Sequence, residues 1–542
     1  MSESSVALEI EHTPDSPVLR VRGARSRGFS ASDGFGYNAG SITRRALTDW
    51  FPSLGGPNTD TLLDLPTTRA RSRDLARNAP LATGALNTIV TTTVGTGLEP
   101  QAKIDRKVLG LTQEQAAEWQ SRAETLYWAH FGAEACDIEG RENMAGLQEL
   151  VLRSALESGD AFVIRRFRER PGDVLGLKLQ VLEADRVSNP ANALNTDRLI
   201  GGVEVDGDGM AIAYHVLNRH PGEFFTPGVF AWERIPAFAA RTGERQVRHI
   251  MRPTRPGQRR GMPLLAPVIE TLKQISRLSE AELAAAVVNA FFTVFIKTAD
   301  GENGMAPIDA TDTTTASGRS VSSSEYKMGP AAMLDLAAGE DVVFADPKRP
   351  NPALEAFFEM MLREVGVAIE LPFEFLVKHF TSSYSASRAA LLEAWRAVVT
   401  RRGWLVRQFC QPSYEWGISE AVTRGYLNAP GFFESPLLRR AWLGTVWIGS
   451  VMGQLNPLDE VNASEKAIQI GISSIAKEAV KNNGGDSEQI HEERVREHSA
   501  RVAGGLEPPV LVPAGASAPA TSTADQRDSA DQAERQNAGG KR

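Results

Sequence analysis

The sequence predicts an α+β fold in which helical segments flank a β-rich centre. Short apolar runs separated by tight turns occupy residues 160–250, a pattern typical of strands. Helical periodicity precedes this region and returns in two long segments, 263–297 and 351–371, which a polar insertion separates. With 542 residues and 42% hydrophobic content, the chain is long enough to build several domains around ordinary cores.

Composition excludes several classes of protein. The net charge of −8 lacks the basic excess of a tight, sequence-reading nucleic-acid binder. It is compatible with a conduit, where attraction to phosphate would slow moving DNA. Cys136 and Cys410 form neither a disulfide framework nor a metal-ligand cluster, which indicates synthesis in a reducing compartment. We find no signal peptide, and the most apolar run, 291–296, is too short to span a bilayer.

The N-terminal third is predicted to be helical after a polar arm. Residues 1–41 read as a disordered, solvated arm. A helical region over 66–94 should break at Asn78-Ala79-Pro80. Thr112 and Gln115 form a capping-box pattern that opens a helix reaching Phe131, and another helix covers Met144 to Ser158.

The β-rich centre carries turn signals and no metal-binding pattern. Asp206-Gly207-Asp208-Gly209 predicts a hairpin turn, because the later ligands of a calcium loop are missing. His215, His220 and His249 lack metal-ligand spacing, so we expect structural histidines, no metal site and no cofactor.

A polar loop between two helices is the candidate functional segment. Asn351-Pro352 should start a helix that ends at Leu371, before Pro372. A second helix should begin near residues 385–387. Its predicted packing residues are Ala389, Leu392, Trp395, Ala397, Val398 and Val399, with four arginines toward water, namely Arg388, Arg396, Arg401 and Arg402. Spacing alone favours a simple αα-hairpin in a core.

The C-terminal third is predicted to be helical and then disordered. Its aromatic residues sit in an apolar context, which favours core packing over stacking on single-stranded nucleic acid; they are Trp404, Phe409, Tyr414, Trp416 and Tyr426. Asn456-Pro457 should start a helix running to about Lys481, and a charged helix should cover 487–503. Residues 504–542 have the composition of a disordered tail.

Three ordered motifs resemble the lambda-type phage portal protein family. The first runs from Ser383 through Trp395 and contains Ser-Arg-Ala-Ala-Leu-Leu-Glu. The second is Arg-Pro-Gly-Gln-Arg-Arg-Gly-Met-Pro at 255–263. The third is Trp447-Ile448-Gly449 followed by Asn456-Pro457. The matches extend over roughly residues 42 to 510.

The resemblance implies a portal fold with named parts. They are a disordered arm at 1–41, a wing at 42–260, a first stem helix at 261–297, a clip at 298–350, a second stem helix at 351–371, a tunnel loop at 372–386, a long helix and return to the wing at 387–455, a helical crown at 456–503 and a disordered tail at 504–542. In this scheme the DNA-facing residues of the tunnel loop are Lys378, His379, Thr381, Ser382, Ser383 and Tyr384.

The same resemblance implies a non-enzymatic ring subunit that has the partners of the family. The chain would form a ring of twelve copies at one capsid vertex of a virion, after synthesis in the cytoplasm of a bacterial host. Double-stranded DNA would pass through the channel without sequence specificity during packaging and ejection. The expected protein partners are the terminase large subunit, the major capsid protein and a head-completion adaptor, with no membrane involved.

Two other functions are compatible with the residues alone. One is a DNA-binding scaffold or adaptor without a closed ring. The other is an enzyme with an unmarked active site, although the chain contains no phosphate-binding Gly-x-x-x-x-Gly-Lys-Ser/Thr, no His-Glu-x-x-His and no Gly-x-Ser-x-Gly. We expect no enzymatic activity.

Overall fold

The computed structural model describes most of the chain between residues 49 and 506. The described ranges are 49–52, 54–223, 228–290, 354–379, 383–453, 457–483 and 487–506, with isolated positions at 39, 45, 47 and 485 and short strands at 9–13, 16–20, 294–298, 313–314, 320–321 and 340–344. Helices and sheets are both present, as the α+β prediction requires. No helix among these residues is long and apolar enough to cross a membrane.

The three predicted N-terminal helical regions form, and two short helices that the sequence did not predict, Pro57–Leu62 and Arg106–Leu109, accompany them. In chain order these helices are α1 (Pro57–Leu62), α2 (Leu65–Asn78), α3 (Pro80–Val94), α4 (Arg106–Leu109), α5 (Gln113–Phe131) and α6 (Met144–Ser158). Pro80 separates α2 from α3, because its ring pre-sets the first turn of a new helix. The capping box at Thr112 and Gln115 is confirmed, since each side chain accepts a hydrogen bond from the other residue's backbone N–H.

Two antiparallel sheets make up the β-rich centre. One has the order β10-β4-β5, with bounds β4 (Asp160–Phe167), β5 (Leu177–Glu183) and β10 (Val247–Met251). The other has the order β6-β7-β8-β9, with bounds β6 (Leu199–Ile200), β7 (Val203–Val205), β8 (Ala211–Leu217) and β9 (Trp232–Pro236). The predicted turn at 206–209 joins β7 to β8, so the hairpin is confirmed.

Strand β4 is buried on both faces and joins two cores. Ala161 and Val163 belong to the larger core, which the surrounding helices build. Phe162 and Ile164 point the other way, into a smaller core shared with the four-stranded sheet. This alternation follows from the two-residue period of a strand. The sheet β10-β4-β5 is therefore a middle layer between helices and a second sheet.

The C-terminal part of the chain packs against the N-terminal helices and the middle sheet, which together with the four-stranded sheet we call the body. β3 (Glu99–Ala102) pairs with β15 (Thr445–Ile448), so the Trp447-Ile448-Gly449 motif lies beside the N-terminal helices. Gly449 faces the Leu98 side chain so closely that a Cβ there would lie 2.5 Å from Leu98 Cδ2. Tyr426 is exposed, but the predicted core packing is confirmed for the other C-terminal aromatics, Trp404, Phe409, Tyr414 and Trp416.

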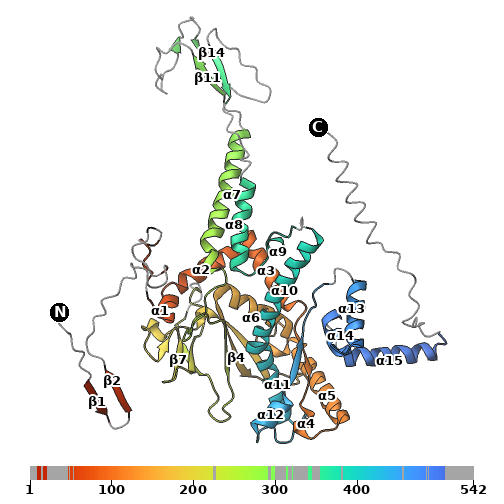
Figure 1. Ribbon diagram of the computed structural model, residues 1–542. Coiled ribbons are helices and arrows are strands. Elements are labelled where there is room, and N and C mark those ends of the chain that lie inside the picture. Colours follow the sequence, from red (N-terminus) through yellow and green to blue (C-terminus); the bar gives the residue numbers. More distant parts are fainter. Residues whose placement is uncertain are drawn as a thin grey trace, which may run out of the picture.

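Between these parts of the chain, a pair of helices projects from the body (Figure 1). α7 spans Ile269–Ala290 and packs beside α8, Leu354–Ala368. The helix predicted over 261–297 is therefore too long at both ends. Pro267 lies in a 3-10 turn over Ala266–Val268 that precedes α7. The aromatic and β-branched run after α7 forms strand β11 (Val294–Thr298), paired with β14 (Glu340–Phe344).

Other predicted boundaries also shift. α8 ends at Ala368 and not at Leu371, because Glu370 adopts a left-handed φ of 58° before Leu371 and Pro372. Within the predicted arm at 1–41, β1 (Glu9–Thr13) and β2 (Ser16–Arg20) pair with each other. The antiparallel pairing runs from Glu9 opposite Arg20 to Thr13 opposite Ser16. Within the predicted clip, β12 (Thr313–Thr314) pairs with β13 (Ser320–Val321).

The remaining helices follow α8 in the chain. They are α9 (Phe373–Val377), α10 (Tyr384–Leu405), a π-helical turn over Val406–Cys410, α11 (Gln411–Thr423), α12 (Pro436–Trp442), α13 (Pro457–Gln469), α14 (Ile475–Asn483) and α15 (Ser487–Ala503). The single helix predicted from 456 to 481 is wrong. Gly471, with a φ of 79°, ends α13 in a Schellman motif in which Ile472 N–H donates to the Ala467 carbonyl.

Candidate functional site

The polar loop lies between α9 and α10, at one end of the helical body. The predicted loop at 372–386 is more ordered than a simple loop, since α9 forms within it and packs on α3 and α8. Lys378 follows α9 in a left-handed conformation with a φ of 55°. The His379 N–H donates to the Glu374 carbonyl at 3.2 Å, which completes the end of this helix.

The structure brings the two ends of the predicted loop to neighbouring helix ends. Lys378 and His379 are exposed at the C-terminus of α9. Ser383 is exposed and precedes α10, whose first residue is Tyr384. The positive end of the α10 dipole therefore lies at this loop. Thr381 and Ser382 fall outside the described residues, as does the Tyr384 side chain.

Two arginines anchor α10, and the prediction that they face water is wrong. Arg401 is only 2% exposed and donates to the Ile369 carbonyl at 2.7 Å and to the Glu370 carboxylate at 3.1 Å. Its guanidinium therefore satisfies a carbonyl at the end of α8. Burial lowers the pKa of Arg401, while Glu370 opposes that shift.

Arg402 ties α10 to a different helix. It donates to the carbonyls of Thr92 and Thr93, at 2.9 and 2.7 Å, and to that of Ser450. Thr92 and Thr93 belong to the last turn of α3, where carbonyls lack helical partners and the dipole is negative. The guanidinium also lies 4.9 Å from the centroid of the Trp395 ring. The predicted packing face of α10 is correspondingly rotated, and Leu392 and Val399 are exposed.

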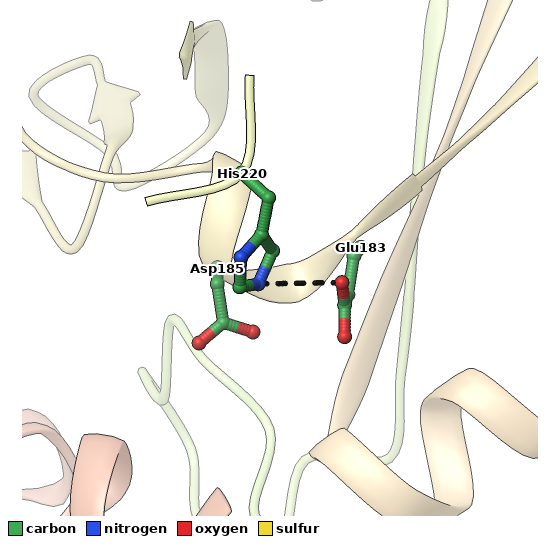
Figure 2. A group of neighbouring side chains, drawn as sticks. All are labelled: Glu183, Asp185 and His220. Carbon is green, nitrogen blue, oxygen red and sulfur yellow. Dashed lines mark ion pairs between the residues drawn. The ribbon is translucent and has the colours of Figure 1, made fainter. Parts of the chain in front are cut away.

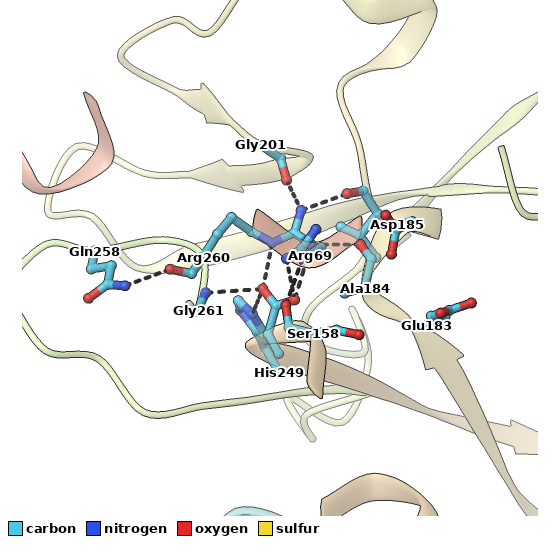
Figure 3. Close-up of polar contacts among 12 residues, drawn as sticks. Arg69, Ser158, Glu183, Ala184, Asp185, Gly201, His249, Gln258, Arg260 and Gly261 are labelled. Atoms are coloured by element: carbon cyan, nitrogen blue, oxygen red, sulfur yellow. Dashed lines mark hydrogen bonds and ion pairs between the residues drawn. The ribbon is translucent and has the colours of Figure 1, made fainter. Parts of the chain in front are cut away.

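A buried ion-pair network lies where α2, the middle sheet and the 255–263 motif meet (Figure 3). The Asp160 carboxylate is fully buried. It accepts hydrogen bonds from Arg69 at 2.7 Å and from Arg260 at 2.6 and 3.2 Å, and lies 3.2 Å from His249 Nε2. Three carbonyls accept the remaining Arg260 donors: Ala184 and Val187 at 2.6 Å and Gly201 at 2.7 Å.

Arg260 thus satisfies all five of its N–H donors in the protein interior. Burial by itself would raise the pKa of Asp160, but the Arg260 and Arg69 charges hold that pKa well below its ordinary value. Burial lowers the pKa of Arg69 to about 10. Burial also lowers the pKa of His249, although Asp160 opposes the shift. The network is a buried set of ion pairs that holds α2, the middle sheet and the 255–263 motif together.

Other residues of the 255–263 motif make hydrogen bonds and close contacts beside this network. The Gln258 amide donates to the Arg260 carbonyl at 2.8 Å, and its oxygen accepts from the Thr254 N–H at 2.9 Å. Gly261 lies against Gly159, where an added Cβ would come within 1.9 Å of the Gly159 carbonyl oxygen. The motif therefore packs the segment that leads into α7 against the middle sheet. Sequence analysis did not identify Asp160 as its buried partner.

A second cluster of titratable groups lies at the edge of the middle sheet. Glu183, Asp185 and His220 each offer a ligand atom within 4.8 Å of the others (Figure 2). His220 Nε2 lies 3.3 Å from the Glu183 carboxylate. The Arg73 guanidinium, however, donates to both carboxylates and supplies their counter-charge. We therefore interpret the cluster as an ion-pair network. Sequence spacing did not reveal it, because His220 comes from a distant loop.

The other two histidines also contact carboxylates. His215 Nε2 lies 3.2 Å from Glu204, which Arg234 also contacts at 2.7 Å. His249 belongs to the Asp160 network described above. These contacts are consistent with the structural roles that the sequence predicts for His215 and His249. Cys136 and Cys410 are both buried and free.

Comparison with known protein families decides what kind of protein carries this site. The model of the family described as "Phage portal protein, lambda family" matches residues 43–402. This span includes both arginine anchors, the polar loop and the 255–263 motif. The chain belongs to the lambda family of phage portal proteins. The resemblance read from the three motifs is thereby confirmed.

Individual relatives of this portal chain agree with the family assignment. Portal protein B of Escherichia phage lambda is 24% identical over 493 residues, covering 87% of this chain and 91% of that protein. The portal protein of Escherichia phage N15 is 24% identical over 482 residues, covering 85% and 89%.

Two solved structures are similar over most of the portal chain. A chain from "Virion of native gene transfer agent (GTA) particle" is 16% identical with a TM-score of 0.42, covering 82% of this chain and 94% of that one. A chain from "Neck of native GTA particle computed with C12 symmetry" is 16% identical with a TM-score of 0.40, covering 83% and 100%. The family assignment rests on the sequence matches.

Proposed function

We propose that twelve copies of this portal chain form a ring at one vertex of a phage capsid, and that double-stranded DNA passes through its channel during packaging and ejection. Membership of the portal family carries the proposal. A closed ring needs two different surfaces on each subunit that meet head to tail. The projecting pair α7–α8 has both helices available for such contacts.

In this proposal the parts of the chain take the family's roles. Residues 42–260 form the wing, α7 and α8 form the stem, residues 298–350 form the clip and α13–α15 form the crown. The clip would meet the terminase large subunit and later a head-completion adaptor, while the outer surface would meet the major capsid protein. The long separation of α7 from α8 in the sequence, with a polar insertion between them, supports a stem and clip.

The loop between α9 and α10 would face the DNA. Its candidate contact residues are Lys378, His379, Thr381, Ser382, Ser383 and Tyr384. Exposed Lys378 and the N-terminus of α10 offer weak attraction to phosphate, and hydroxyl groups can hydrogen-bond phosphate without a large charge. The buried anchor Arg401 and the half-buried anchor Arg402 would hold such a loop at a fixed place in the channel.

Light scattering on the purified chain, with negative-stain images, tests the ring. We expect a particle of about twelve times 58.8 kDa whose end-on views show a central hole. A stable dimer or tetramer without a hole would reject the proposal. Because a ring is required for a channel, this measurement precedes any assay of DNA transport.

A further inference from the structure

The helices α13 and α14 have an inverted distribution of polar and apolar side chains. Among residues 457–482, the buried side chains are Ser464 and Glu478. The Glu478 carboxylate accepts hydrogen bonds from Ser464 at 2.6 Å and from Ser473 at 2.7 Å, and the Asn482 amide donates to Ser464 at 2.9 Å. The contact between these two helices is therefore polar.

Large apolar side chains of these two helices and of the bend between them are exposed. Leu458, Ile470, Ile472 and Ile475 are between 69% and 77% exposed. Ile470, Ile472 and Ile475 lie within six residues around the bend between α13 and α14, and we call them the isoleucine turn. Three large exposed aliphatic side chains at one bend are typical of a contact surface and not of a solvated loop.

The same chain carries an apolar groove elsewhere. The groove has a volume of about 710 Å³ and lies between α10 and β15, where Leu392, Trp395, Val399, Trp447 and Ile448 line it. Leu392 and Val399 are 44% and 52% exposed although they belong to a helix with buried anchors. We call this feature the α10–β15 groove.

The isoleucine turn does not fill the groove of its own chain. α13 and α14 contribute Glu460, Val480, Lys481 and Asn482 to the lining, so the three isoleucines stay outside it. One chain thus presents an apolar projection and an apolar recess at different places. Surfaces of this kind make heterologous contacts between copies, which close into a ring when the rotation permits.

We infer that the isoleucine turn of one copy docks into the α10–β15 groove of a neighbouring copy. The inference rests on the proposed ring, and it names a contact that holds adjacent subunits together close to the loop between α9 and α10. The groove runs along the same helix whose first residues border that loop. Neighbouring subunits would therefore be coupled directly to the helices that carry the DNA-facing residues.

Cysteine cross-linking of the full-length chain tests the contact. Both native cysteines are buried, so introduced cysteines will be the reactive ones. Chains carrying Ile472→Cys and chains carrying Val399→Cys are co-expressed, and a short bismaleimide is added. We expect a cross-linked dimer in the mixture and none in either variant alone. A dimer from Ile472→Cys alone would indicate a symmetric contact and would overturn the docking into the groove.

An assembly measurement separates this inference from the proposed ring. Ile472→Asp should raise the chain concentration needed for half-assembly by about tenfold or more, because it places a charge in an apolar contact. Leu194→Asp is the matched control, since Leu194 is also highly exposed but lies outside both surfaces. Unchanged assembly of Ile472→Asp, with a ring in the unaltered chain, overturns the inference and leaves the proposed function standing. A stable dimer or tetramer without a hole in the unaltered chain rejects the proposed function, while cross-linking still decides the contact.

Discussion

The side chain of Arg260 connects separate segments of the chain through individual hydrogen bonds. Its five donors reach a carboxylate and three carbonyls from separate segments of the chain. A lysine has only three donors and no planar fork, so it cannot replace these bonds. The residue holds the middle sheet against the segment that leads into α7.

Arg260→Ala should destabilise the protein by about 3–5 kcal/mol, because it leaves the buried Asp160 carboxylate with fewer partners. Chemical denaturation followed by tryptophan fluorescence measures the change. Arg260→Lys should recover only part of the loss. Arg363→Ala is the control, since Arg363 forms an exposed pair with Glu359 and should change the free energy of unfolding by less than about 1 kcal/mol.

Lys378 permits a residue-scale test of the proposed DNA-facing loop. Lys378→Glu should leave ring assembly intact, because Lys378 is exposed beyond the end of α9. It should impair packaging or retention of DNA, since each copy in the ring would then repel phosphate. DNA content of particles measures the effect. Lys107→Glu, at an exposed position on α4, is the charge-matched control. Normal packaging by Lys378→Glu would contradict the assignment of this loop.

At the scale of elements, α10 is held in place by cations that bind carbonyl groups. Arg402 contacts the end of α3 and Arg401 contacts the end of α8, so three helices share one junction. These contacts replace the intrahelical partners that terminal carbonyls lack. The loop between α9 and α10 therefore adjoins a helix, α10, that is fixed to α3 and α8.

Arg402→Ala should loosen this junction, with a loss of about 2–3 kcal/mol, because three carbonyls lose a charged donor. Hydrogen exchange of peptides from α10 and from the end of α3 should increase together. Arg396→Ala on the same helix is the control, since Arg396 forms an exposed ion pair with Glu393. Equal exchange in the two variants would show that Arg402 does not anchor α10.

The polar contact between α13 and α14 predicts a pH dependence. Hydrogen bonds from Ser464 and Ser473 lower the pKa of Glu478 from 4.5 to about 2. A lowered pKa in the folded state means that the carboxylate stabilises the contact above about pH 4.5. That stabilisation is lost as the pH falls toward 2.

Hydrogen exchange over 457–483, corrected for the intrinsic effect of pH, measures this loss. We expect faster exchange at pH 3 than at pH 7 in the unaltered chain. Glu478→Gln should already exchange faster at pH 7 and should change less with pH, because it cannot ionise. A Glu478→Gln variant that matches the unaltered chain at pH 7 would contradict the stabilising role of the carboxylate.

At the scale of the whole molecule, the charge predicts weak affinity for free DNA. A net charge of −8 gives no general attraction to phosphate, so any contact depends on local groups such as Lys378. Fluorescence anisotropy with a labelled duplex at 150 mM salt should detect no binding below about micromolar chain concentration. Nanomolar binding would favour a DNA-gripping adaptor over a channel through which DNA slides.

The positions of several helices and the protein family could be predicted from the sequence alone. The Thr112 capping box, the break before Pro80 and the bounds of α6 depend on neighbouring residues, whose sterics and hydrogen bonds act within a few positions. The three motifs identified the family for the same reason, since each is a short contiguous pattern.

The burial of charged side chains and the ends of the long helices depend on contacts between distant parts of the chain, so they became visible only in the folded protein. Arg401 and Arg402 looked solvent-facing because their carbonyl partners are distant in sequence, up to 310 residues away for Arg402. α7 ended early because the following run pairs with β14, a partner some 46 residues further on. The inverted packing of α13 on α14 was hidden for the same reason: burial of a polar group depends on partners that only the folded chain supplies.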